Sequence, residues 1–158
     1  MSSSPLIQTL ASPHPSAIAN IRGDMASPVK GLATFYNNYM GGVLVQVEVF
    51  HLPDNDRPYF SGFFGMHIHE FGDCTPPFDK TGNHYNPTNQ DHPFHAGDFP
   101  PLLSGHGYAW MSFWAPRISI SEIIGKLIII HKGKDDFTTQ PSGQSGEKIA
   151  CGVIEAYI

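Results

Sequence analysis

The sequence is poor in charge, and it lacks both a basic run and a long apolar run. Charged side chains make up only 15% of its 158 residues, and the formal net charge is −5. This composition argues against a general nucleic-acid binder, which needs a basic surface. The apolar run 127–130 has the length of a strand, whereas a membrane span needs about 18 apolar residues. We therefore expect neither a nucleic-acid partner nor a membrane span.

The start of the chain lacks the basic and apolar regions of a signal peptide. We expect a flexible N-terminal tail over residues 1–16 and one domain over residues 17–158, because a chain of this length suits a single core. The compartment stays open. An exported protein of the periplasm or cell envelope is expected if a leader was removed, and a cytoplasmic one otherwise.

Cysteine is also scarce, with Cys74 and Cys151 as the only two. They fit free thiols, metal ligands or one disulfide, and their spacing does not choose among these.

Turn residues and strand patterns, in contrast, are plentiful. The 16 glycines and 14 prolines are scattered, which is typical of a turn-rich all-β chain. Apolar and alternating runs predict strands over residues 17–22, 29–36, 43–51, 60–70, 96–103, 108–115, 126–132 and 148–157, with a short strand or turn over 118–124. About eight strands predict a closed or sandwich-like β-barrel. Two long polar loops, 71–94 and 133–146, are of the kind that usually carries function.

Three aromatic residues share the predicted strand 108–115. Alternation sends Trp110 and Trp114 to one face of the strand and Phe113 to the other. We interpret them as core residues in preference to an exposed dimer patch.

Histidine is unusually frequent, with nine in the chain. His67 and His69 alternate along a predicted strand, so both rings lie on one face. Such a pair fits a metal site and a hydrogen-bonded pair about equally well. His131 closes an apolar strand, a place more typical of a structural histidine.

The first long loop and its exit hold a denser cluster: His84, His92, His95 and Asp98. Three imidazoles and a carboxylate suit a tetrahedral zinc site. The alternative is a polar loop with incidental histidines.

Three histidine-bearing segments stand out: residues 65–74 (GMHIHEFGDC), residues 82–88 (GNHYNPT) and residues 95–98 (HAGD). They resemble, in that order, the copper-ligand strand, the segment with the bridging histidine and the zinc-ligand segment of the copper/zinc superoxide dismutase family, and its bacterial branch in particular. Residues 130–136, 139–143 and 150–154 follow the bacterial branch. The resemblance covers about residues 17–158 in the family's order and spacing.

This resemblance implies an eight-stranded, immunoglobulin-like Greek-key β-barrel that uses copper and zinc. The implied copper ligands are His67, His69, His84 and His131. The implied zinc ligands are His84, His92, His95 and Asp98, with His84 bridging the two metals. The loop between His84 and His95 is short for the family. Of the implied zinc ligands, His92 is the one whose assignment this short loop affects most.

The resemblance also implies supporting roles for three residues. Asp135 matches the carboxylate that hydrogen-bonds one copper and one zinc histidine, here His67 and His92. Cys74 and Cys151 match the family's disulfide.

One position departs from the family pattern. Three residues before the second cysteine the family has an arginine that guides superoxide, and this chain has Lys148. The implied catalytic residues are therefore His84 and Lys148. Lysine keeps the charge but loses the planar fork of donors, so we expect a lower rate and a steep salt dependence. The alternative is a tolerated surface lysine.

The reaction implied by the resemblance is 2 O₂⁻ + 2 H⁺ → O₂ + H₂O₂, with copper cycling between Cu(II) and Cu(I). Superoxide is then the small-molecule partner, and a homodimer is left open. The remaining histidines, His14, His51 and His106, match no ligand position and are expected at the surface. Three other functions stay open: a cupin-type dioxygenase, a copper- or zinc-storage protein, and a non-catalytic metal-binding relative of the family.

Overall fold

Strands dominate the computed structural model, which describes residues 14–54 and 62–158. The strands are β1 (Ala17–Gly23), β2 (Lys30–Asn37), β3 (Val43–Phe50), β4 (Phe63–Phe64), β5 (Met66–His69), β6 (Leu102–Leu103), β7 (Ala109–Ala115), β8 (Leu127–His131) and β9 (Lys148–Ala156). Two short helical segments, η1 (Asp79–Thr81) and α2 (Ile120–Ile123), lie between strands. None of the described helices is long and apolar enough to cross a membrane.

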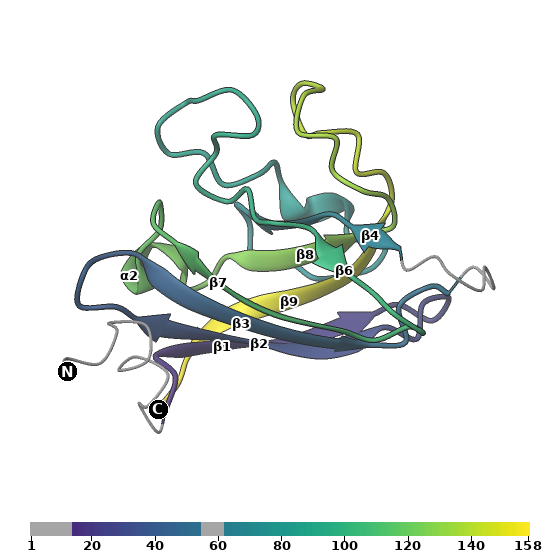
Figure 1. The fold of residues 1–158 in the computed structure, drawn as a ribbon, viewed down its shortest axis with the longest axis horizontal. Coiled ribbons are helices and arrows are strands. Elements are labelled where there is room, and N and C mark those ends of the chain that lie inside the picture. Colours follow the sequence, from purple (N-terminus) through teal and green to yellow (C-terminus); the bar gives the residue numbers. More distant parts are fainter. Residues whose placement is uncertain (1–13, 55–61) are drawn as a thin grey trace.

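Seven of these strands form one antiparallel sheet in the order β5-β8-β9-β1-β2-β3-β7, and β4 pairs with β6. The sheet curls, so that β8 lies above β2 and β3 (Figure 1). The predicted all-β barrel is therefore confirmed. The tail predicted over residues 1–16 falls mostly outside the described residues. Only residues 14–16 of this tail are described, and Ser16 donates its backbone N–H to the carbonyl of Phe35.

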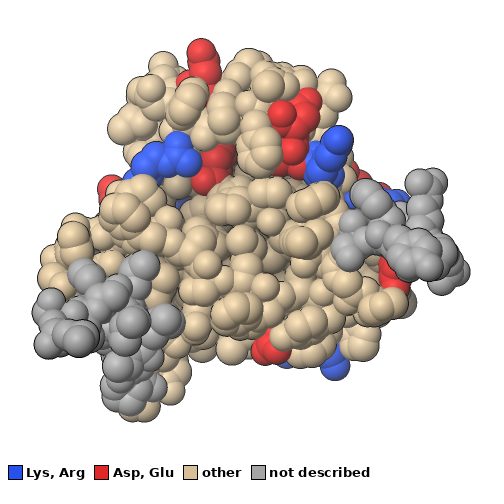
Figure 2. All heavy atoms as spheres, viewed as in Figure 1, with Lys and Arg blue, Asp and Glu red and all other residues tan. Residues whose placement is uncertain are grey.

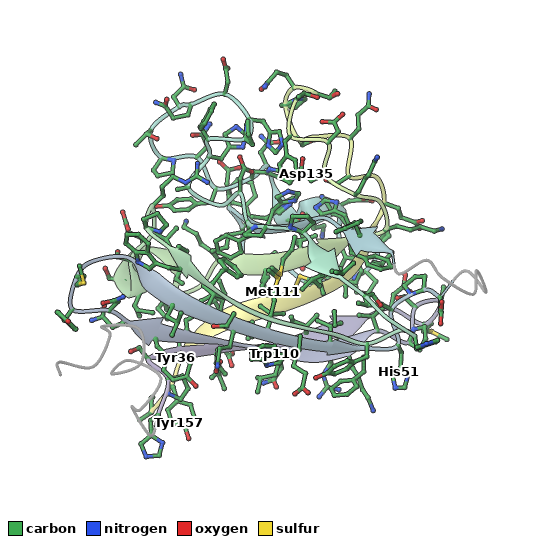
Figure 3. The ribbon with its side chains drawn as sticks, in the orientation of Figure 1. Tyr36, His51, Trp110, Met111, Asp135 and Tyr157 are labelled. Atoms are coloured by element: carbon green, nitrogen blue, oxygen red, sulfur yellow. A yellow bond between two sulfur atoms is a disulfide. The ribbon has the colours of Figure 1, made fainter. Side chains whose placement is uncertain are left out.

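The core forms where alternating side chains of the curled sheet face inward. On β3, the fully buried residues are Val43, Val45, Val47 and Val49. Met111 of the neighbouring β7 also points into the interior (Figure 3). Burying a side chain of this size contributes about 1.5–3 kcal/mol, so this alternation is enough to orient the strand.

Three predicted elements differ from the structure. The strand predicted over 96–103 is reduced to β6, because the backbone of residues 96–98 pairs with β5 as a loop. The strand predicted over 60–70 is divided into β4 and β5, and residues 60 and 61 lie outside the described part. The short strand or turn predicted over 118–124 is wrong, because a helix, α2, forms there. Its N-cap Ser119 and the Glu122 side chain form a capping box.

The two tryptophans of β7 are not core residues, which corrects the interpretation from sequence. Trp110 is 58% exposed and Trp114 is 49% exposed, whereas Phe113 faces inward and meets Phe99 edge-on at 5.0 Å between ring centroids. Trp110 lies on the outer face of the sheet, as Figure 3 shows. Alternation therefore divided the three rings correctly, but the tryptophan face is the solvent face.

Two long loops rise from the same side of the barrel, beyond β5 and β8 (Figure 1). One joins β5 to β6 and the other joins β8 to β9. In the view of Figure 2, charged side chains gather mainly on these loops and at their base, while the barrel wall is largely uncharged. The fold thus places polar loops above an apolar barrel.

Candidate metal centre

The edge of β5 is completed by loop backbone. Ile68 donates its N–H to the carbonyl of Gly97 (2.9 Å) and accepts from the N–H of Tyr85 (2.7 Å). Gly97 in turn donates to the carbonyl of Tyr85 (2.8 Å). A side chain at Gly97 would collide with the Ile68 carbonyl, so this close approach requires glycine.

This backbone pairing brings loop residues against the histidines of β5. His69 forms an isolated β-bridge with His84, and His67 forms one with Asp98. Residues that lie 15 to 31 positions apart in the sequence are therefore neighbours in the structure.

Seven buried side chains gather here in two groups, and within each group the potential ligand atoms all lie within 4.8 Å of one another. The first group is His67, His69, His84 and His131. The second group is His84, His92, His95 and Asp98. His84 belongs to both groups, so one imidazole ring joins them.

In the first group, three rings are held by one nitrogen and leave the other nitrogen free. The hydrogen bonds that hold them are His67 Nε2 to Asp135 Oδ2 (2.7 Å), His69 Nδ1 to Gly82 O (3.0 Å) and His131 Nδ1 to Gly146 O (3.1 Å). Among the described residues, six buried side-chain nitrogens have no hydrogen-bond partner, and four of them belong to this group: His67 Nδ1, His69 Nε2, His84 Nε2 and His131 Nε2. A buried, unpaired polar atom costs about 1–3 kcal/mol, so four together call for a ligand, and a metal ion satisfies all four.

The second group surrounds Asp98. Its Oδ1 lies 2.8 Å from His84 Nδ1, and its Oδ2 lies 3.1 Å from His92 Nδ1 and 3.2 Å from His95 Nδ1. A tetrahedral zinc site with bonds of about 2.0 Å has ligand-to-ligand edges of about 3.3 Å. Three imidazoles and one carboxylate at this spacing therefore fit zinc.

Burial keeps three histidines of the first group neutral. It lowers the pKa of His67 to about 4, that of His69 to about 2 and that of His131 to about 3. Neutral imidazole is the form that binds metal, so these rings are ready to bind at neutral pH.

Asp135 lies on the second long loop, where it contacts one histidine of each group (Figure 3). It accepts from His67 Nε2 (2.7 Å) through one oxygen and from His92 Nε2 (2.9 Å) through the other. Burial acts to raise the pKa of Asp135, but hydrogen bonds from His67, the Phe137 amide and His92 outweigh it and hold that pKa below its usual range. The carboxylate therefore fixes the orientation of one ring from each group.

The sequence agrees with this geometry. Residues 29–154 match the sequence model of copper/zinc superoxide dismutase. The chain belongs to that family. It is 33% identical over 130 residues to the Cu-Zn superoxide dismutase 1 of Aquifex aeolicus, an alignment that covers 72% of this chain and 73% of the relative. It is 32% identical over 155 residues to the Cu-Zn superoxide dismutase of Deinococcus radiodurans, covering 84% and 81%.

A solved structure is similar as well. The double mutant of a SOD-like protein from Bacillus subtilis matches with a TM-score of 0.77 and 30% identity, covering 88% of this chain and 97% of that one. The Greek-key β-barrel of the superoxide dismutase family is therefore the fold of this chain. The two groups also suit the family's two metals, since four imidazoles suit copper and the group around Asp98 suits zinc.

In this member of the superoxide dismutase family, the first group opens into a pocket of about 440 Å³. His69, His84 and His131 line the pocket, together with Lys148. His67 is fully buried below them.

The Lys148 ammonium is held at the side of this pocket. Its Nζ donates to Thr81 Oγ1 (2.8 Å) and to Phe78 O (3.3 Å). Burial lowers the pKa of Lys148, an effect that nearby Asp79 partly opposes. An ammonium has three N–H donors, so these two contacts leave one for an anion or water in the pocket.

The disulfide that the family resemblance implied is present between Cys74 and Cys151. It joins the first long loop to β9. Cys151 lies in a small buried cluster with Phe78, Leu127 and Ile129.

Three histidines lie outside both groups, as expected. His14, His51 and His106 are exposed, and His14 stacks with Tyr157 at 5.8 Å between ring centroids. His106 Nδ1 lies 3.9 Å from Asp54 Oδ2.

Sequence reasoning missed three residues that support the site. Thr81 holds Lys148, Gln140 binds the backbone of His92, and Gly143 packs against Asp135. Gly143 has a φ of +69°, and a side chain there would overlap the Asp135 carboxylate. Gln140 and Gly143 lie in the segment 139–143 that follows the bacterial branch, but that resemblance assigned them no role, and a loop threonine such as Thr81 has many ordinary uses.

Proposed function

We propose that this protein is a superoxide dismutase, which converts two superoxide anions and two protons into O₂ and H₂O₂. One observation carries the proposal: four unpaired imidazole nitrogens converge at the floor of an open pocket, and one of those rings also faces the second group. Copper, when bound, supplies the one-electron cycle between Cu(II) and Cu(I).

The proposed ligands follow the two groups. Copper would be held by His67 Nδ1 and by the Nε2 atoms of His69, His84 and His131. Zinc would be held by the Nδ1 atoms of His84, His92 and His95 and by Asp98. His84 would be held in position by zinc, which would have no redox role of its own.

His84 is the residue suited to move a proton. Its Nε2 faces the copper group, while its Nδ1 is directed at Asp98 in the zinc group. When Nε2 is free of metal, it can take up a proton and deliver it to the reduced superoxide. A second proton from water completes H₂O₂, while the other superoxide leaves as O₂.

Lys148 is the residue suited to attract the anion. It lines the same pocket as His84 and His131, and one N–H of its ammonium is left for a ligand. A cation inside a cleft raises the local concentration of an anionic substrate, and this effect weakens as salt screens the charge.

The test is superoxide decay after rapid mixing, with protein loaded with one copper and one zinc per chain. We expect decay far faster than with zinc-only protein, and a rate that falls steeply with ionic strength. Copper bound at one equivalent with no faster decay would contradict the proposal and favour a storage protein or a non-catalytic relative. A single bound metal ion per chain would favour a mononuclear enzyme instead.

A further inference from the structure

We propose that Gln140 is a positioning residue for His92, the zinc-group histidine on the first long loop. It acts from the second long loop and touches neither metal nor substrate. The proposal rests on the zinc assignment above and is independent of the dismutase reaction.

The contact uses both ends of the Gln140 amide. Gln140 Oε1 accepts the backbone N–H of His92 at 3.0 Å, and Gln140 Nε2 donates to the backbone carbonyl of His92 at 2.7 Å. One side chain thereby pairs both backbone groups of a residue 48 positions away, as a neighbouring strand would. These are also short, partly buried hydrogen bonds, so they hold the backbone of His92 firmly.

The first loop holds His92 in a turn in which Phe94 donates its N–H to the Asp91 carbonyl (2.8 Å). A turn closes ahead of it, where Asn86 Oδ1 accepts the N–H of Gln90 (2.9 Å) and Asn86 Nδ2 donates to the Gln90 carbonyl (2.8 Å). His92 itself turns to the second loop, through Gln140 at its backbone and through Asp135 Oδ1 at its Nε2 (2.9 Å). The second loop therefore adds three hydrogen bonds that orient His92 within its turn.

Gln140 is itself held on a braced turn. Asp136 accepts the N–H of Thr139 at Oδ1 (2.8 Å) and its hydroxyl at Oδ2 (2.6 Å). Gly143 donates its N–H to the Thr139 carbonyl (2.7 Å), and Asp136 donates its own to the Gly143 carbonyl (2.9 Å). The amide of Gln140 thus projects from a rigid support, as a positioning residue requires.

This arrangement predicts a selective effect on one metal. Without the amide, the backbone of His92 loses both hydrogen bonds to the second loop while its ring keeps the bond to Asp135, so zinc affinity falls. Loss of a partner that orients a metal ligand typically weakens binding about 10- to 100-fold, and we expect the low end because Asp135 remains. Copper affinity is expected to change less than about twofold, since His92 is not in the copper group.

The experiment compares Gln140→Leu with Gln144→Leu, a control at an exposed glutamine of the same loop. The zinc dissociation constant is measured by chelator competition, and the visible absorption of Co²⁺ in the zinc group reports its coordination geometry. We expect about tenfold weaker zinc binding and an altered Co²⁺ spectrum for Gln140→Leu only. Gln140→Glu, which keeps the size of the side chain but loses the donor, is expected to behave likewise and serves if the leucine variant does not fold.

Unchanged zinc affinity in folded Gln140→Leu or Gln140→Glu would overturn the proposal. Equal losses for both glutamines, or for both metals, would also overturn it, since either shows a general loosening of the loop. Because the readouts are metal binding and absorption, they stand apart from dismutase activity. A Gln140-dependent zinc site in a protein that leaves superoxide intact would contradict only the proposed function.

Discussion

Lys148 places a single ammonium beside the pocket, where the family has arginine. Arginine presents a planar fork with five donors, whereas lysine presents three donors around one point charge. Two of the lysine donors are committed to Thr81 and Phe78. The anion can then accept one hydrogen bond from Lys148, whereas an arginine could donate two.

Lys148→Arg is accordingly expected to raise the rate of superoxide decay about two- to threefold at low ionic strength, because the fork can hold the loop and still offer donors to the anion. Rapid-mixing assays on fully loaded protein measure this. Lys132→Arg is the matched control, since Lys132 is exposed and paired with Glu147 at 3.3 Å. A rate for Lys148→Arg no higher than that of the unmodified protein would show that the fork brings no advantage here.

Residues of the metal centre differ in how well the sequence revealed them. His84, His92, His95 and Asp98 were found as a cluster from residue type and spacing alone. His131 was not, because a histidine that ends an apolar strand has an ordinary structural use. Only the family resemblance added it to the copper group. Supporting residues such as Gln140 act through contacts between loops that are distant in the sequence. The spacing of residues along the chain does not predict such contacts.

At the scale of elements, the metal centre depends on a loop that is tied to the barrel at two points. Near its start, Cys74 links it to β9 through Cys151, and farther on Tyr85 pairs with β5. The disulfide closes a span of 77 residues. Constraining a loop of that length stabilises the folded state by about 4 kcal/mol on the chain-entropy account.

Replacing both cysteines, as Cys74→Ser with Cys151→Ser, is therefore expected to lower the free energy of unfolding of metal-free protein by about 4 kcal/mol. Urea unfolding at neutral pH, followed by tryptophan fluorescence, measures the change. Oxidised and reduced forms of the unmodified protein provide the control. Equal unfolding midpoints in all these forms would mean that the crosslink adds nothing to stability.

Strand patterns predicted the barrel elements well and the connections poorly. The ends of β1, β3 and β7 lie within one residue of those predicted, because each is a run of seven or eight residues. Strand β6 has only two residues, so it is too short to show the two-residue alternation that identifies a strand in the sequence. The helix α2 spans four residues, and only its capping box at Ser119 and Glu122 signals it.

At the scale of the whole molecule, the barrel buries neutral imidazoles that the unfolded chain would expose to water. The folded-state pKa values of His67 and His131, about 4 and about 3, lie below the ordinary 6.5. Between those values the unfolded chain binds more protons, so stability rises with pH across that window. Asp135 acts in the same direction, because its lowered pKa contributes stability that is lost as its carboxylate is protonated.

Metal-free protein is accordingly expected to lose stability steadily as the pH falls from about 7 to about 4. Thermal unfolding followed by circular dichroism across that range, at constant ionic strength, measures the loss. His14→Gln is the control, because it replaces an exposed histidine that lies outside both metal groups. A flat dependence of the unfolding midpoint on pH would contradict the account of buried neutral rings.

Trp110 and Trp114 show that an alternating pattern alone does not determine which face of a strand is buried. Both faces of β7 are largely apolar in sequence, so alternation separates the two sets of side chains without saying which set is inside. The structure decides it, because β7 is the end strand of the seven-stranded sheet and Phe113 meets Phe99 inside the barrel.

The shared ring of His84 is what makes the two groups a single centre. Loading Cu(II) into both groups and recording the electron paramagnetic resonance spectrum tests this most directly, because a bridging imidazolate couples the two unpaired electrons. We predict loss of most of the signal intensity expected for two isolated Cu(II) ions, and its recovery when zinc replaces one of them. Two independent signals at full intensity would contradict the bridge, and with it the paired copper–zinc centre.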